Sequence, residues 1–214
     1  MNVRIIDHSG NPEKTPGRAA AICTASRDPG KSLAHSIEAG HESVLEHAVF
    51  TFEITGVSRA LLAQLTRHRI ASFSVKSQRY VPLGEMPCVI PPTIQRNAAV
   101  CKLYTDMTAA IRRVYDQMIT CGVPKEDARY ITPQGAQTDL IMTMNARELR
   151  HFFALRCCGR AQWEIRDLAT RMLAACRDIA PALFESAGPE CLRTGCHELK
   201  SCGHPWKAKE VDGK

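Results

Sequence analysis

The feature that most constrains the fold is a short segment of strictly alternating polarity. From Ala48 to Thr55, large apolar residues occupy every second position and polar residues mostly stand between them. Because successive side chains of a strand point to opposite faces, this segment predicts a strand that buries one face. Such one-sided strands are typical of antiparallel sheets. The same alternation at Leu140, Met142 and Met144 predicts a second strand.

The segments before this strand predict short elements. Val3 to Asp7 predicts a strand, residues 11–17 a loop, and Arg18–Ser26 and Ser32–Ala39 two short helices.

Gly56 is expected to end the alternating strand. Ser58 is expected to cap a helix from Arg59 to His68. On that helix, Gln64, Arg67 and His68 have the spacing of residues that share one face.

Two longer helices follow. Pro91-Pro92 is expected to start a scaffold helix that reaches about Cys121, and a second long helix has an apolar stripe from Ile165 to Leu183. Between them, Pro124 is expected to open a helical turn that carries Arg129.

A further helix is predicted to start at Ala146, because Asn145 and Glu148 have the spacing of a capping box. Its apolar stripe continues into Arg156, and a buried guanidinium is costly unless it is paired or bound. Arg156 is either a core residue neutralised by a carboxylate such as Glu164, or a donor aimed at a polar ligand in a dry pocket.

The stretch from Gln64 to Tyr80 is basic and has no compensating acid. No Asp or Glu occurs from Ile54 to Gly84, a window that contains three arginines and one lysine from Arg67 to Arg79 as well as Arg59. Uncompensated cations and serine hydroxyls suit a phosphate. The alternative is a solvated basic face, but the alternation of Ala71, Phe73 and Val75 with serines indicates a half-buried strand.

The segment from His41 to His47 contains two histidines and two glutamates. A spacing of six residues does not align two side chains on a helix face, so we favour hydrogen bonding over a metal site here.

Composition limits the class of protein. The chain has 214 residues, is 44% hydrophobic and carries a net charge of +6, which fits one globular domain, or one domain and a small appendage, with a local basic site. No long apolar run and no signal peptide is present, so we expect a soluble cytoplasmic protein.

The ten cysteines do not suggest a disulfide framework, because there is no sign of secretion. Cys191, Cys196 and Cys202 cluster near the end of the chain with His197 and His204. These groups are either ligands of a structural zinc ion or reduced thiols in a loose tail.

An ordered set of motifs resembles the flavin-dependent thymidylate synthases. The chain has Arg67-His68-Arg69, then seven residues, then Ser77-x-Arg79-Tyr80; the matching pieces around it are His41-Glu42-Ser43, Glu46-His47, Phe50, Gln64, Arg129, Asn145-Ala146-Arg147, Leu155-Arg156 and Ala161-Gln162-Trp163-Glu164. The resemblance spans residues 3–186. It implies a domain over residues 1–188 and a Cys/His-rich tail over 189–214.

The resemblance implies an α+β fold, with an antiparallel sheet flanked by long helices, in a homotetramer whose sites form where subunits meet. The implied enzyme is a methyltransferase that converts dUMP to dTMP, with methylenetetrahydrofolate as carbon donor, NADPH as reductant and FAD as carrier. It implies no metal, nucleic acid or membrane partner.

Matching positions assign the implied site residues. Those that would hold dUMP are Gln64, Leu65, Thr66, Arg67, Val75, Lys76, Ser77, Gln78, Arg79, Arg129 and Arg156. Those that would hold FAD are Ser43, Glu46, Arg67, His68, Arg69, Asn145, Arg147 and His151. Arg156 would be catalytic, because it would stabilise charge on the uracil ring. The chain departs from the common family pattern at Ser74, Val75, His151 and Arg160.

Two other classes of function remain open from the residues. A basic nucleic-acid-binding module would explain Arg67 to Arg79, although aromatic residues are only 6% of the chain. A zinc-stabilised interaction protein would centre on the tail.

Overall fold

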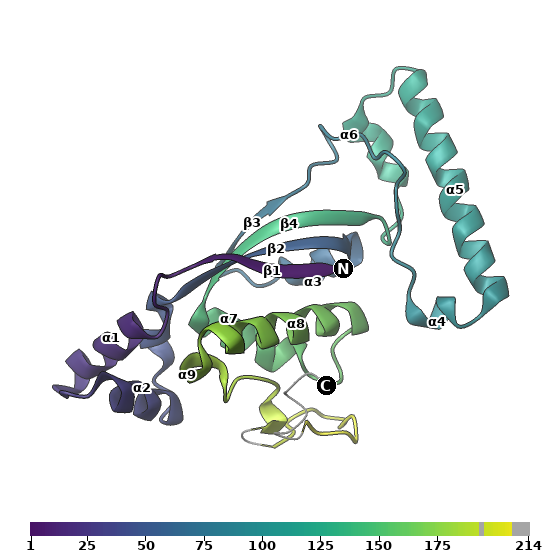
Figure 1. Ribbon diagram of the computed structural model, residues 1–214. Helices are drawn as coiled ribbons and strands as arrows, with labels where there is room; N and C mark the ends of the chain where they lie inside the picture. Colours follow the sequence, from purple (N-terminus) through teal and green to yellow (C-terminus); the bar gives the residue numbers. More distant parts are fainter. Residues whose placement is uncertain (193–194, 207–214) are drawn as a thin grey trace.

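The computed structural model of the chain describes residues 1–192 and 195–206. At its centre lies a four-stranded antiparallel sheet with the order β1-β2-β4-β3 (Figure 1). The strands are β1 (Asn2–His8), β2 (Val49–Ser58), β3 (Ala71–Val75) and β4 (Gln137–Asn145). The predicted antiparallel sheet and the α+β class are confirmed.

The hydrophobic core lies between one face of the sheet and the helices below it. These helices are α3 (Arg59–Leu65), α7 (Ala146–Arg156), α8 (Trp163–Ile179) and α9 (Pro181–Phe184). Phe50, Phe52 and Met142 are completely buried there. This is the burial that the alternation of β2 and β4 predicts.

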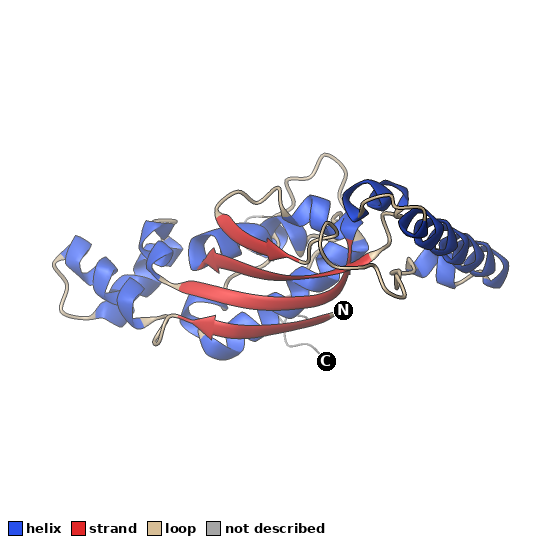
Figure 2. Cartoon of the chain, turned by 90° about the horizontal axis from the view of Figure 1, so that it is seen from above, coloured by secondary structure: helices blue, strands red, loops and turns tan. Residues whose placement is uncertain are grey.

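The opposite face of the sheet carries polar residues. Thr51 of β2 and Thr143 of β4 are paired across this face, with their hydroxyls 3.0 Å apart. No helix of the described residues covers this face, as the view from above shows (Figure 2).

The connection from β2 to α3 differs from the expectation. Gly56 does not end β2 but lies in an irregularity of the strand, with a φ of +69° that glycine adopts without strain. The Ser58 cap is confirmed, because its hydroxyl accepts a hydrogen bond from the Leu61 N–H. Helix α3 ends at Leu65, so the predicted helix through His68 is too long.

The N-terminal helices start earlier than predicted. Helix α1 spans Lys14–Thr24 and includes part of the expected loop, because Pro16 is compatible with a first helical turn. Helix α2 (Pro29–Glu38) begins where the Asp28 side chain accepts from the Lys31 N–H. A 3-10 helix, η1 (Glu42–His47), then leads into β2.

Residues 91–133 form a helical arm that projects away from the sheet (Figure 1). It contains α4 (Pro92–Gln95), α5 (Ala98–Thr120), α6 (Lys125–Ala128) and the 3-10 helix η2 (Arg129–Ile131). The single long helix predicted from Pro91 is wrong. Asn97 interrupts it and caps α5, accepting from the N–H groups of Ala99 and Val100.

Much of the apolar stripe of α5 is exposed in this chain, contrary to its predicted scaffold role, although Tyr115 is buried. Leu103 is 69% exposed and Met107 is 61% exposed. Exposed large apolar residues in a row are typical of surfaces that interact with other molecules.

The C-terminal part is also segmented. The predicted stripe to Leu183 is divided between α8 and α9, because Pro181 starts a new helix. A short 3-10 helix, η3 (Glu190–Leu192), begins the tail. Among the described residues, no helix has both the length and the apolar character to cross a membrane.

Candidate functional site

The turn between α3 and β3 presents two arginines to solvent and one histidine to the interior. Arg67 and Arg69 are exposed, whereas His68 is only 5% exposed. The predicted common face of Gln64, Arg67 and His68 is wrong, because α3 ends before Thr66.

His68 connects a buried carboxylate to a guanidinium. Its Nδ1 lies 3.1 Å from Oε1 of Glu148, and its Nε2 lies 3.1 Å from Nε of Arg156. Arginine is always a donor, so Nε2 must accept and Nδ1 must carry the proton that is donated to Glu148. The contacts therefore select one tautomer of His68.

His68 is neutral in this arrangement. Burial lowers its pKa, the hydrogen bond to Glu148 opposes that effect, and the charge of Arg156 lowers the pKa further. A neutral imidazole can accept from Arg156, which a protonated one cannot do. Glu148 thus orients the imidazole, and the imidazole orients the guanidinium.

Arg156 is not neutralised by Glu164. The Glu164 carboxylate instead accepts from the backbone N–H and the hydroxyl of Ser58, where α3 begins. Burial and then the nearby charge of Arg67 lower the pKa of Arg156. Neither the Arg67 nor the Arg156 guanidinium forms an ion pair within the residues that the structure describes. Two neighbouring cations without carboxylate partners favour the binding of an anionic or electron-rich ligand.

Residues of α7 and of the η1 helix add polar groups beside the cluster of His68, Glu148 and Arg156. Arg147 is paired with Glu46 of η1, and the ring of His151 lies 6.0 Å from that of His68. Ser43 lies on the same η1 helix and is exposed. The structure therefore gathers most of the residues assigned to FAD around the start of α7.

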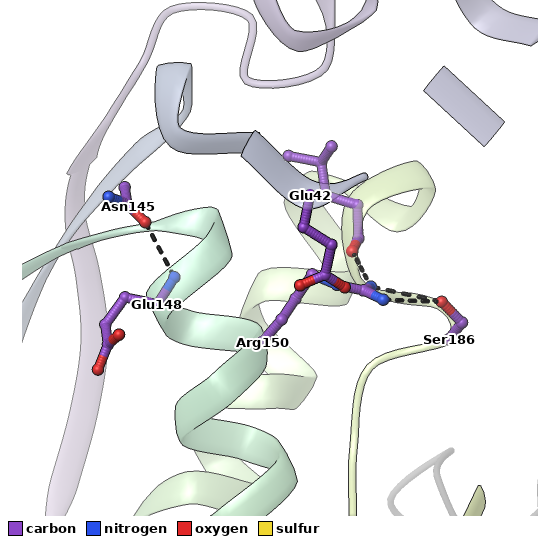
Figure 3. Close-up of polar contacts among 6 residues, drawn as sticks. Glu42, Asn145, Glu148, Arg150 and Ser186 are labelled. Atoms are coloured by element: carbon purple, nitrogen blue, oxygen red, sulfur yellow. Dashed lines mark hydrogen bonds and ion pairs between the residues drawn. The ribbon is translucent and has the colours of Figure 1, made fainter. Parts of the chain in front are cut away.

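An ion pair between the buried Arg150 and the partly exposed Glu42 holds η1 against α7 (Figure 3). The Nε of Arg150 lies 2.8 Å from Oε1 of Glu42, and its Nη1 donates to the Leu183 carbonyl at 2.7 Å. Ser186 accepts further hydrogen bonds from the same guanidinium. This network fixes the position of the residues that η1 presents.

Asn145 plays a structural part. Its side chain accepts from the Glu148 N–H at 2.9 Å and caps α7 (Figure 3). The Glu148 carboxylate turns to His68, so the predicted capping box is only half formed.

A second polar cluster lies where the arm meets the sheet. Arg79 and Arg129 both contact Glu126: the Nε of Arg79 lies 2.9 Å from its carboxylate, and the Nε of Arg129 donates to its carbonyl. The Ser77 hydroxyl accepts from the Arg79 N–H. The three residues assigned to a phosphate therefore lie near one another. In this structure the guanidinium of Arg79 is already paired with the negatively charged carboxylate of Glu126.

Arg129 has a second cationic neighbour in Arg59. Burial and then the charge of Arg129 lower the pKa of Arg59, and both residues line a pocket with Thr66. Among the described residues, Arg59 pairs with no carboxylate. This pocket is a second place that suits an anion.

Another pocket, beside Lys76, holds unsatisfied polar atoms. The Nε2 of Gln78 and the Oγ1 of Thr138 line it, and both are buried with no hydrogen-bond partner in the described structure. Lys76, on the same wall, is ion-paired with Asp139. Buried polar atoms without partners mark a place where a ligand can bond.

The pocket with Lys76 and Gln78 lies apart from the His68 cluster within one chain. His68 contacts Glu148 just beyond the end of β4, whereas Lys76 contacts Asp139 near its start. Six residues of an extended strand separate those points, roughly 20 Å. Of the residues assigned to dUMP, Lys76 therefore lies far from Arg156, whereas Thr66 and Arg129 share a pocket next to Arg67.

Other assigned residues have core roles, and some site residues were missed. The Leu65 side chain is completely buried, and the half-buried Val75 packs against the core. Sequence reasoning missed Glu148 as a partner of His68, Arg59 beside Arg129, and Glu126 at Arg79. Only Arg59 carried a signal, because it lies in the acid-free window.

Comparison with known proteins agrees with the motifs. The family model described as "Thymidylate synthase complementing protein" matches residues 4–182. A flavin-dependent thymidylate synthase of Geobacter sulfurreducens is 44% identical over 226 aligned positions, which cover 99% of this chain and 96% of the relative. Relatives with that same name are 38% identical in Clostridium tetani (99% and 96% covered) and 46% identical in Pyrococcus furiosus (78% and 72% covered).

Proposed function

This chain belongs to the flavin-dependent thymidylate synthase family, and we propose that it makes dTMP by reductive methylation of dUMP. The carbon donor is methylenetetrahydrofolate, the reductant is NADPH and the flavin is FAD. The observation that carries the proposal is the His68–Arg156 pair, a preorganised neutral imidazole and a guanidinium without a carboxylate. The basic nucleic-acid module and the zinc-stabilised interaction protein do not account for this pair.

The residues present fit a flavin dinucleotide. Its diphosphate needs cationic donors, and Arg67 and Arg69 are exposed on the turn that also carries His68. Ser43, Glu46, Arg147 and His151 supply further polar groups around the same place. When bound, the flavin accepts a hydride from NADPH and delivers it to the pyrimidine, which is chemistry that no side chain can supply.

The work of the protein is positioning and electrostatics. Arg156 contacts the uracil ring and stabilises the negative charge that develops when the ring loses its N3 proton. His68 holds the Arg156 guanidinium in place, and Glu148 holds His68. Ser77, Arg79 and Arg129 bind the phosphate, for which Arg79 must exchange the Glu126 carboxylate for the ligand.

The separation of the clusters supports a site shared between copies. A nucleotide such as dUMP is shorter than the distance along β4 from Lys76 to the neighbourhood of Arg156. One chain therefore supplies one end of the site, and a second copy supplies the other. The exposed apolar stripe of α5 and the uncovered face of the sheet are surfaces on which copies of this chain would meet, in a homotetramer.

The proposal is tested first by the colour and redox behaviour of the protein. The purified chain is expected to carry FAD, to absorb blue light and to oxidise NADPH faster when dUMP is present. Released cofactor is identified by chromatography, and NADPH oxidation is followed by absorbance. A protein that stays colourless after incubation with FAD under native conditions contradicts the proposal.

The phosphate assignment makes a separate prediction. Arg79→Ala removes a charge-assisted fork and is expected to weaken dUMP binding by about 1.5–3 kcal/mol, roughly ten- to a hundredfold. Binding is measured by calorimetry with dUMP and with deoxyuridine, which lacks the phosphate. Arg96→Ala, at an exposed arginine of the arm, is the matched control. Equal affinity of the wild type for deoxyuridine and dUMP would show that the phosphate contributes nothing.

A further inference from the structure

The described part of the tail packs beneath the turn between α7 and α8 (Figure 1). The two segments enclose a pocket that is rich in metal-binding side chains. Its lining includes four thiols and two imidazoles: Cys158, Cys191, Cys196, Cys202, His197 and His204. Cys158 comes from the α7–α8 turn, whereas the other five come from the tail.

Two of the thiols lie in turns of the same design. Cys158-Gly159-Arg160 and Cys202-Gly203-His204 are both Cys-Gly-x sequences. In each, the backbone N–H of the third residue donates to the cysteine Sγ at 3.4 Å. The two turns therefore hold their sulfur atoms in the same way, with a backbone N–H directed at each.

The two turns face each other. A Cβ placed on Gly159 would lie 3.2 Å from the Sγ of Cys202, so the Cys202 side chain packs directly on the Gly159 backbone. Cys191 and Cys202 both lie close enough to Cys158 for their charges to interact with it. The Cys158 thiol also lies 3.9 Å from the Glu198 carboxylate. Thiol groups from distant parts of the chain therefore converge on one pocket.

We propose that this pocket is a zinc site, with Cys158, Cys191, Cys196 and Cys202 as the four ligands. Thiolates are soft ligands, and four of them suit a closed tetrahedral Zn²⁺ site. Arg160, on the wall of the same pocket, offsets the negative charge of such a centre.

Within the described residues, no three side chains already stand in metal-binding geometry. Zinc binding must therefore draw the thiols inward, which is usual where metal binding and local folding are coupled. Cys196 is exposed and has the most room to move.

A metal bound in this pocket would hold the chain in place next to the proposed active site. Cys158 follows Arg156 by two residues, so a metal bound there fixes the end of α7 that carries the guanidinium. This consequence rests on the proposed function, whereas the metal site itself does not.

The test is zinc content of the full chain, purified under reducing conditions from cells supplied with zinc. The wild type is expected to hold about one Zn²⁺ per chain by elemental analysis. Cys202→Ser and Cys158→Ser are each expected to lose at least about nine-tenths of that zinc. Cys121→Ser, at an exposed thiol on the arm, is the control that retains it.

A second measurement does not depend on whether the variants fold. Cobalt replaces zinc in the wild-type protein, and thiolate ligation is expected to give intense sulfur-to-cobalt absorption in the near ultraviolet. A chelator should remove the metal and lower the melting temperature of the wild type. Wild-type protein without zinc, zinc retained by Cys202→Ser, or a disulfide among the four cysteines would each overturn the proposal. None of these outcomes depends on dTMP synthesis.

Discussion

Arg156→Met is expected to lower dTMP formation by about a hundred- to a thousandfold while the protein still folds, holds FAD and oxidises NADPH. Methionine fills a similar volume, and replacement of a half-buried charge by an apolar side chain is often tolerated by the fold. The loss should therefore fall on the step in which charge develops on the uracil. Arg156→Lys should recover only part of the rate, because an ammonium group lacks the planar fork.

Product formation and NADPH oxidation are measured on the same FAD-loaded preparation. Arg171→Met removes an exposed guanidinium from α8 and is the matched control, which should retain both rates. Near-wild-type dTMP formation by Arg156→Met would show that Arg156 has a structural role and not a catalytic one.

Glu148→Gln is expected to reduce dTMP formation by about ten- to a hundredfold, although Glu148 touches no ligand in the proposed site. The carboxylate can only accept, so it selects the Nδ1–H tautomer of His68. Glutamine can also donate to Nδ1, which would place the proton on Nε2. An Nε2–H group cannot accept from Arg156, so the guanidinium would lose its support.

The tautomer is observed directly by nitrogen NMR of the His68 ring, a signal that a purely structural role of Glu148 would leave unchanged. In the Arg156→Met background, Glu148→Gln should cause little further loss of turnover, because both changes remove the same function. Glu85→Gln, at an exposed loop residue, is the control. An unchanged tautomer, or losses that add fully in the double variant, would refute this role.

The parts of the fold that the sequence predicted depend on local patterns. Alternating residues predict β2 and β4 because side-chain direction has a period of two, and Ser58 and Asn145 cap their helices as their positions indicate. The errors arise where local signals compete. The stripe after Pro91 continues in register across Asn97, yet the asparagine side chain ends one helix and starts the next.

The candidate site was predicted in its residue types more than in its contacts. Arg156 was recognised because a cation interrupts an apolar stripe, but its partner proved to be His68 and not Glu164. Eighty residues separate His68 from Glu148, and no local pattern reports a contact at that distance. The same holds for Cys158, which meets the tail thiols only after the chain has folded.

The central claim is tested most directly by product analysis. The purified, FAD-loaded protein is given dUMP, methylenetetrahydrofolate and NADPH, and dTMP is quantified by mass spectrometry. A methylene carbon needs two electrons to become a methyl group, and NADPH supplies two. We expect dTMP to form in proportion to the NADPH that its synthesis consumes and to carry the isotope label of the folate methylene. Oxidation of NADPH without any labelled dTMP would contradict the account.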